Sequence, residues 1–188
     1  MARIMPTQGF ALFATPIGHC GMAWSAHGLT GVQLPELSEA ATRERMTRRF
    51  APCPESPPPP WVQAAMHAVV ALLSGQPGEP ADLSHIALDM DGVPPFHQRV
   101  YTLARRIGPG DTLTYGEVAR QLGEPGAARA VGQALGANPF APVVPCHRVL
   151  AAKAGAGGFS AHGGVSTKLR LLQIERARFD GPGLFDDA

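Results

Sequence analysis

The run NPFAPVVPCHRVL at residues 138–150 holds the side chains of this sequence that are best suited to nucleophilic chemistry. Cys146 and His147 are neighbours there, and Arg148 follows them. A thiolate is a strong nucleophile, and cationic neighbours favour ionisation of a thiol, whose ordinary pKa is about 8.5. The run is apolar on both sides of Cys146, so a buried structural cysteine fits it as well. These residues alone leave both interpretations open.

Other kinds of site fit this segment less well. One cysteine and one histidine fall short of the four ligands of a structural zinc ion. A Cys/His hydrolase normally draws its histidine from a distant part of the sequence. The glycine-rich stretch at residues 154–166 has no nucleotide-phosphate motif, but its glycines let the backbone approach a ligand closely. Because neighbouring residues of a strand point to opposite faces, Cys146 and His147 can act together only across a turn or a bridging water.

The composition is that of a folded protein with free thiols. Apolar residues make up 45% of the 188 residues and charged residues 16%, which predicts a packed core. The sequence shows no membrane span and no secretory signal. Its three cysteines form no CxxC pair, which argues against disulfides and favours a cytoplasmic protein. His19, Cys20 and His27 lie close together in sequence without a convincing fourth ligand, so we predict no metal site.

Charge is distributed unevenly along the chain. Residues 1–94 contain 5 Lys and Arg against 8 Asp and Glu, a balance of −3, whereas residues 95–179 contain 11 against 4, a balance of +7. Residues 180–188 form an acidic tail with three aspartates, which brings the total to +1. The basic half suggests contact with a polyanion, although a chance excess of surface arginine explains it equally well.

We expect a small α/β domain over residues 1–93. Three short, partly alternating apolar runs within residues 9–34 predict three antiparallel strands. The run HIALDM at residues 85–90 is a candidate for one more strand. Nothing in this region points to chemistry of its own.

Two helices and a proline-rich segment complete this first domain. A helix is expected at residues 38–50, with Ser38 as its N-cap, and another at residues 61–75. Between them, residues 51–60 contain six prolines, which predicts a stiff, exposed connector.

The second domain, residues 94–179, is expected to be mainly helical and to contain a helix-turn-helix. Thr114 and Glu117 have the spacing of a capping box, so a helix should begin at Tyr115. The next helix should carry Pro125 in its first turn. Two short helices joined by a tight turn are typical of the helix-turn-helix motif.

The second of these helices has an unusually bare surface. Ala128, Gly132 and Gly136 fall every four residues, and Arg129 is its only charged residue. Small residues at this spacing are common where helices pack closely in a core. They also suit a helix that enters the minor groove of DNA, which is roughly 6 Å wide. Arg129 would then be free to push into the base stack.

The motif PCHRV at residues 145–149 resembles that of the O6-alkylguanine-DNA alkyltransferases, also called methylated-DNA–protein-cysteine methyltransferases. AARAVGQALGANP precedes it and GGVSTKLRLLQIE follows it, so that the resemblance runs from about Phe96 to Glu175. The resemblance implies direct repair of double-stranded DNA. One alkyl group passes from O6-alkylguanine, with O4-alkylthymine as a second candidate substrate, to Cys146 and inactivates the protein. It also implies a monomer that needs no cofactor.

The resemblance further implies roles for individual residues. Cys146 attacks the alkyl carbon, His147 takes the thiol proton through a water, and Glu175 orients His147. Asn138 ties the turn that joins the DNA-binding helices to the cysteine. Tyr115 helps to rotate the phosphate and donates to guanine N3. Arg129 fills the gap that the flipped base leaves. Residues implied to contact DNA are Thr114, Tyr115, Ala128, Arg129, Gly132 and Arg148. Residues implied to line the substrate pocket are Tyr115, Leu135, Pro145, Val149, Phe159 and Ser160.

Two departures and two alternatives accompany this interpretation. Phe159 stands where many relatives have tyrosine, and the SAHGG loop is two residues longer than an SGG-like version, which affects Ser160, the implied donor to O6. One alternative is a lesion sensor that binds without transfer, but such family members lack the cysteine. The other is a transcriptional regulator, but these relatives carry an additional metal-binding domain.

Overall fold

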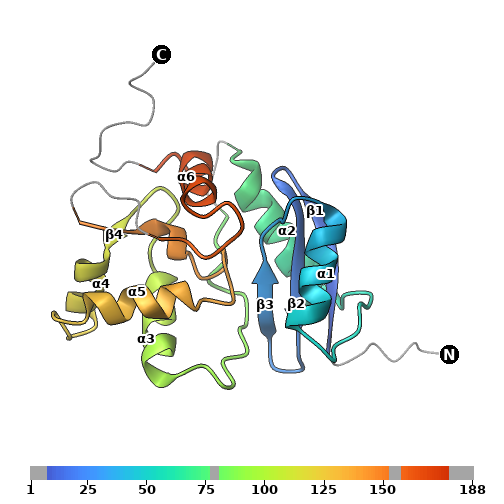
Figure 1. The fold of residues 1–188 in the computed structure, drawn as a ribbon, viewed down its shortest axis with the longest axis horizontal. Coiled ribbons are helices and arrows are strands. Elements are labelled where there is room, and N and C mark those ends of the chain that lie inside the picture. Colours follow the sequence, from blue (N-terminus) through green and yellow to red (C-terminus); the bar gives the residue numbers. More distant parts are fainter. Residues whose placement is uncertain (1–7, 77–80, 153–157, 178–188) are drawn as a thin grey trace, which may run out of the picture. The chain divides into compact units, whose positions relative to one another are not determined.

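The computed structural model describes residues 8–76, 81–152 and 158–177. The chain divides into two compact units (Figure 1). The first unit comprises the residues up to Val93 together with Pro139–Val144, and the second comprises Pro94–Asn138 and the residues from Pro145 onward. The predicted acidic tail lies outside the described residues. Among the residues described, no helix is both long and apolar enough to cross a membrane.

The segment Pro139–Val144 differs from its predicted place in the second domain. The Pro139 carbonyl accepts a hydrogen bond from Val32 N at 2.8 Å and another from Arg49 Nη2 at 3.1 Å. Arg49 Nη1 also bonds to the Val32 carbonyl, at 3.2 Å. These long-range bonds attach the segment to the first unit, and sequence patterns do not reveal them.

A three-stranded antiparallel sheet lies at the centre of the first unit, in the order β1-β2-β3. Its strands are β1 (Gly9–Thr15), β2 (Gly18–Trp24) and β3 (Leu29–Gln33). Large side chains of the sheet are almost completely buried, Phe10, Met22 and Trp24 among them. The predicted small antiparallel sheet is confirmed.

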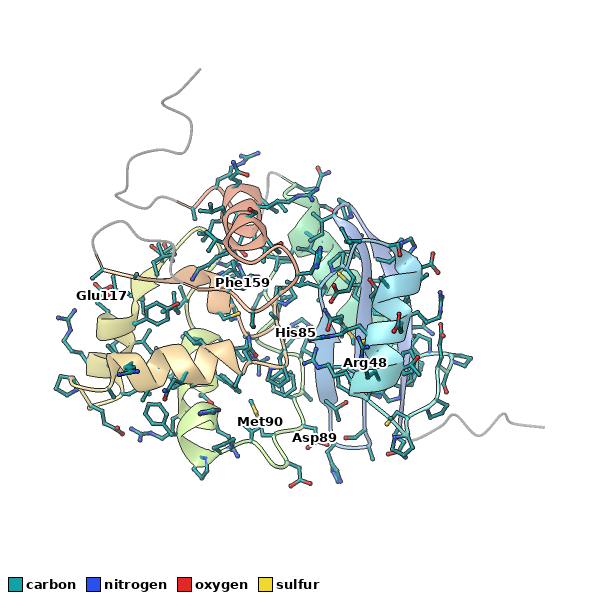
Figure 2. The ribbon with its side chains drawn as sticks, viewed as in Figure 1. Arg48, His85, Asp89, Met90, Glu117 and Phe159 are labelled. Atoms are coloured by element: carbon teal, nitrogen blue, oxygen red, sulfur yellow. The ribbon has the colours of Figure 1, made fainter. Side chains whose placement is uncertain are left out.

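The additional strand predicted at residues 85–90 is wrong, because the segment forms a single bridge to β3. Leu29 N donates to the Ala87 carbonyl at 2.9 Å, and Asp89 N donates to the Leu29 carbonyl at 2.8 Å. The Asp89 carboxylate then accepts hydrogen bonds from Ser25 Oγ and Asp91 N, which favours a turn. Figure 2 labels Asp89 on this segment.

Two helices of the first unit follow their predicted end signals. Helix α1 (Glu39–Arg49) begins after Ser38, whose hydroxyl accepts from Ala41 N at 3.1 Å. Helix α2 (Pro60–Ser74) has proline at its first position and ends at Gly75, which has the left-handed backbone conformation that glycine adopts easily. Part of the connector runs beside β1, since Phe10 N donates to the Pro54 carbonyl at 3.0 Å.

The second unit is mainly helical. It contains α3 (Pro95–Ala104), β4 (Leu113–Thr114), α4 (Tyr115–Gln121), α5 (Ala128–Gly136), the 3₁₀ turn η1 (Cys146–Arg148), β5 (Val149–Leu150) and α6 (Val165–Ile174). The capping box at the start of α4 is present as predicted: Glu117 N donates to Thr114 Oγ1, and Thr114 N donates to the Glu117 carboxylate. Strands β4 and β5 pair in parallel, Leu113 with Val149 and Thr114 with Leu150.

The turn between α4 and α5 is longer than the sequence predicts. Helix α5 begins at Ala128, so Pro125 lies in the turn and not in the first helical turn. Glu124 N donates to the Ala119 carbonyl, and Ala127 N donates to the Glu124 carbonyl, each at 2.9 Å. These bonds keep Pro125 in the connection between two short helices that pack against each other.

Candidate active site

Cys146 and His147 are brought together by the 3₁₀ turn η1. On a strand these neighbours would point to opposite faces, but in this turn both side chains are buried, with Cys146 6% exposed and His147 fully buried. The turn therefore allows Cys146 and His147 to act together, which a strand would not.

The His147 ring is held by Glu175, the residue that directly follows α6. Nε2 of His147 lies 2.8 Å from Oε1 of Glu175. A carboxylate accepts hydrogen bonds, so Nε2 carries the ring proton and Nδ1 is the basic nitrogen. Nδ1 is buried and has no hydrogen-bond partner within the described part of the chain. Burial lowers the pKa of His147 more than Glu175 raises it, so the imidazole is neutral at rest.

Arg148 binds the same carboxylate from the other side. Its Nε donates to Glu175 Oε2 at 2.9 Å and its Nη2 donates to Oε1 at 2.7 Å. Burial alone would raise the pKa of Glu175, but the hydrogen bonds and charges of His147 and Arg148 lower it to about 2. The carboxylate is therefore ionised at any physiological pH.

The implied role of Arg148 as a DNA contact is wrong. Its side chain is only 7% exposed, and all three nitrogens of the guanidinium group donate within the second unit, to Glu175 and to the Ile107 carbonyl. A side chain that is buried and fully bonded cannot reach a phosphate outside the protein.

Several neighbours act on the Cys146 thiol. Burial raises its pKa, whereas a hydrogen bond with Asn138, the charge of Lys168 and nearby backbone groups lower it. The burial effect is the largest, so the resting group is a thiol. The sequence points to His147 and Arg148 as the groups that favour the thiolate, but Asn138 and Lys168 do so in the structure.

Lys168 is a buried cation of α6 to which the sequence analysis assigns no role. Its Nζ donates to the Val149 carbonyl at 2.6 Å and lies 5.7 Å from the centre of the Tyr115 ring. Burial lowers the pKa of Lys168 to about 8, against the opposing charge of Cys146. Lys168 and Glu175 are seven residues apart, about two helical turns, and this spacing was the available signal that both face the same site.

A cavity of about 530 Å³ lies next to Cys146, within the size range of small-molecule sites. Residues of α5 and of the segment before α6 line much of it, and Figure 2 labels Phe159 on that segment. Cys146 is nearly buried, whereas Arg129 and Ser160 are exposed, so the sulfur lies deep and these two lie toward the surface. The lining residues are Tyr115, Ala128, Arg129, Gly132, Gln133, Leu135, Gly136, Cys146, Gly158, Phe159 and Ser160.

The lining overlaps the implied pocket only in part. Pro145 and Val149 are not among the lining residues, and both are buried because they precede and follow the turn η1. Gln133, on the other hand, was missed, although it lies one helical turn after Arg129 and therefore on the same face of α5. Thr114 uses its hydroxyl in the capping box of α4.

The bare stripe of α5 does not pack into a core. A Cβ added at Gly136 would meet no atom of the described residues within 4 Å, and one added at Gly132 would meet only the Tyr115 ring, at 3.8 Å. Both glycines and Ala128 line the cavity, beside the exposed Arg129. This observation argues against the close-packing interpretation of the stripe.

Comparison with known proteins decides the family. Residues 95–177 match the family model described as "6-O-methylguanine DNA methyltransferase, DNA binding domain". Over 164 residues the chain is 36% identical to the methylated-DNA–protein-cysteine methyltransferase of Mycobacterium tuberculosis strain H37Rv, an alignment that covers 87% of this chain and 90% of that protein. This chain belongs to the methylated-DNA–protein-cysteine methyltransferase family.

Other members of the family give the same picture over most of the chain. The family protein of Methanothermobacter thermautotrophicus is 32% identical over 166 residues, which cover 88% of this chain and 84% of that one. The crystal structure of Mycobacterium tuberculosis OGT in complex with DNA superposes with a TM-score of 0.70 at 34% identity, covering 92% of this chain and 96% of that chain.

Proposed function

We propose that this protein repairs DNA by transferring one methyl or larger alkyl group from O6-alkylguanine in double-stranded DNA to Cys146. The observation that carries this proposal is the position of the thiol deep in a cavity, next in sequence to a neutral His147 that is bonded to the Glu175 carboxylate. Family membership and the DNA complex of the Mycobacterium tuberculosis relative support DNA as the partner. Because the substrate carries the group that is transferred, the reaction needs no cofactor.

The chemical step moves one alkyl group and one proton. The thiol proton passes through a water to Nδ1 of His147, and the resulting imidazolium is stabilised by the Glu175 carboxylate. The Sγ–C bond forms while the C–O6 bond breaks, and the electron pair of that bond stays on O6. Tyr115 and Ser160 line the cavity as candidate hydrogen-bond donors that stabilise the guanine anion, and the proton held on His147 returns to the guanine through water. A thioether is a poor leaving group, so each molecule reacts once.

Access to the lesion requires that the base leave the stack. The O6 atom of a stacked guanine cannot reach a sulfur deep in a cavity, so the nucleotide must flip out of the duplex. The small residues of α5 suit the narrow minor groove, and the exposed Arg129 beside them suits the gap in the stack. The protein acts as a monomer in this proposal, and the need for a reduced thiol favours the cytoplasm.

The test is a stoichiometric repair assay on duplex DNA that contains O6-methylguanine. We expect lesion loss to stop at one per protein, and Cys146→Ser to abolish loss while it keeps lesion binding. Lesion binding without lesion loss in the wild-type protein would contradict transfer and favour the sensor alternative. Arg129→Ala should slow repair of duplex DNA more than reaction with the free base, and affinity should fall steeply with salt.

A further inference from the structure

Arg148 is a buried residue of the second unit that has no role in the chemical step proposed above. It follows Cys146 and His147 in the turn η1, and its guanidinium joins two separate parts of the unit. On one side it holds both oxygens of Glu175, and on the other it donates to the Ile107 carbonyl, which follows α3. A side chain with this many charge-assisted bonds is fixed in place.

We propose that Arg148 is a positioning residue for alkyl transfer, which fixes the Glu175 carboxylate so that it orients His147 to accept the proton of Cys146. This inference rests on the proposed function. Arg148 does not touch the substrate cavity, so it acts only through Glu175 and His147.

One oxygen atom of Glu175 is shared by His147 and Arg148. Oε1 of Glu175 accepts both from His147 Nε2 at 2.8 Å and from Arg148 Nη2 at 2.7 Å. The second Arg148 bond, from Nε to Oε2, prevents rotation of the carboxylate about its axis. Oε1 therefore stays directed at His147, which keeps the proton on Nε2 and leaves Nδ1 basic.

The charge of Arg148 also lowers the proton affinity of the His147–Glu175 pair. A fixed positive charge beside the pair disfavours any further proton, and it lowers the pKa of both Glu175 and His147. Lys168 lowers the pKa of His147 in the same direction. Without the charge of Arg148, the buried pair would bind a proton at higher pH, and a protonated pair cannot accept another from the thiol.

The pH dependence of single-turnover transfer tests this role in Arg148→Gln and Arg148→Lys. We expect Arg148→Gln to move the acidic limb of the rate profile upward by about one pH unit or more, with at least a tenfold loss near pH 7 that recovers in part at pH 9. Arg148→Lys keeps the charge but loses the two parallel hydrogen bonds to Glu175. The acidic limb of its pH–rate profile should therefore stay near that of the wild type, while its maximal rate falls.

Arg99→Gln is the matched control, because it breaks an exposed ion pair of the same unit, Arg99 with Glu124 at 2.6 Å. Its profile should coincide with that of the wild type. If Arg148→Gln loses the same fraction of its transfer rate at all pH values, without a shift of the acidic limb, the inference is overturned and the role of Arg148 is structural. If Arg148→Gln does not fold, a limb in Arg148→Lys that shifts upward by one unit would overturn it equally.

A second readout separates this inference from the proposed function. The rate at which iodoacetamide labels Cys146 reports the same proton transfer without DNA. If the wild-type protein fails to demethylate O6-methylguanine, the proposed function fails, but labelling of Cys146 should still show the shift in Arg148→Gln. An unshifted labelling profile would contradict the role of Arg148 whatever the substrate.

Discussion

Each of the two units contains neighbouring histidine and cysteine residues with a glutamate partner, yet the surroundings differ. In the first unit His19 and Cys20 lie on strand β2, and His19 Nε2 is 3.3 Å from Glu39. The side chains of His19 and Glu39 are 40% and 45% exposed, whereas Cys20 is fully buried and burial raises its pKa to about 12. In the second unit Cys146 and His147 are both buried, and the His147–Glu175 pair is 2.8 Å apart.

The difference shows that backbone conformation decides whether these residue types can cooperate. The strand sends Cys20 into an apolar core and His19 to the surface, so that the base and the thiol lie on opposite faces of the sheet. The turn η1 sends both side chains inward, next to a cavity. Among the described residues, the buried side chains of histidine, arginine and lysine all belong to the second unit: His147, Arg148 and Lys168. The buried polar residues of the first unit are Gln33 and Thr42, which do not ionise.

Replacing the histidine of each His–Glu pair should separate the two units most clearly in the rate of alkyl transfer. His147→Asn should slow alkyl transfer by about 10²- to 10⁴-fold, the usual contribution of a general base. His19→Asn should leave the rate unchanged, because its ring is on the surface of a different unit. Single-turnover rates with O6-methylguanine duplex, measured on folded proteins, check both. Similar losses in the two variants would contradict the distinction between the pairs.

Acid should destabilise the fold through the second pair. The pKa of Glu175 is about 2 in the folded protein and about 4.3 in the unfolded chain, so its contribution is complete above pH 4.3 and is lost as the pH falls towards 2. The loss amounts to roughly 3 kcal/mol for that shift. His147, whose pKa is also lowered, adds a loss in the same direction below about pH 6.5.

Chemical denaturation between pH 7 and pH 2 measures this loss. Glu175→Gln should be less stable at pH 7 and should lose less between pH 4.3 and 2 than the wild type. Parallel stability curves for the two proteins in that window would show that Glu175 is not the group that titrates.

Lys168→Met should reduce transfer about tenfold while keeping the volume of the side chain. The charge of Lys168 lowers the pKa of Cys146, so its loss should raise that pKa and leave less thiolate. The exposed Arg170, on the same helix, provides the control Arg170→Met, assayed at saturating DNA. The Lys168→Met protein loses one hydrogen bond to the Val149 carbonyl, so its free energy of unfolding should fall by no more than about 2 kcal/mol. An unchanged rate would remove Lys168 from the site.

The smallest effect is expected at the end of α6. Arg176 has a φ of 54°, a conformation that glycine adopts more easily. Arg176→Gly should therefore stabilise the protein by about 0.5–1 kcal/mol, since relief of about 1–2 kcal/mol is partly offset by a more flexible unfolded chain. Thermal unfolding measures it, with Gln173→Gly inside the helix as a destabilising control. A loss of stability in Arg176→Gly would mean that the side chain is needed there.

Local signals predicted much of the fold. Ser38, Gly75 and the Thr114–Glu117 box set helix ends through contacts of a few residues, and alternation predicted the sheet. Local patterns do not predict long-range contacts, and the contact of His147 with Glu175, 28 residues away, was implied by the family resemblance alone. Nothing near Arg148 in sequence shows that its partner is 27 residues away, and nothing in PCHRV reveals a 3₁₀ turn. The strand predicted at residues 85–90 is wrong because the segment makes a single bridge to β3 before Asp91 N bonds to the Asp89 carboxylate and favours a turn.

Mapping the methyl group on the three cysteines identifies the reactive thiol. After reaction with O6-methylguanine duplex, the protein is digested and the peptides of Cys20, Cys53 and Cys146 are weighed. We expect a gain of one methylene unit on the Cys146 peptide alone, at one per protein. A methyl group on Cys20 or Cys53, or three unmodified peptides after lesion loss, would contradict the assignment of the reactive thiol.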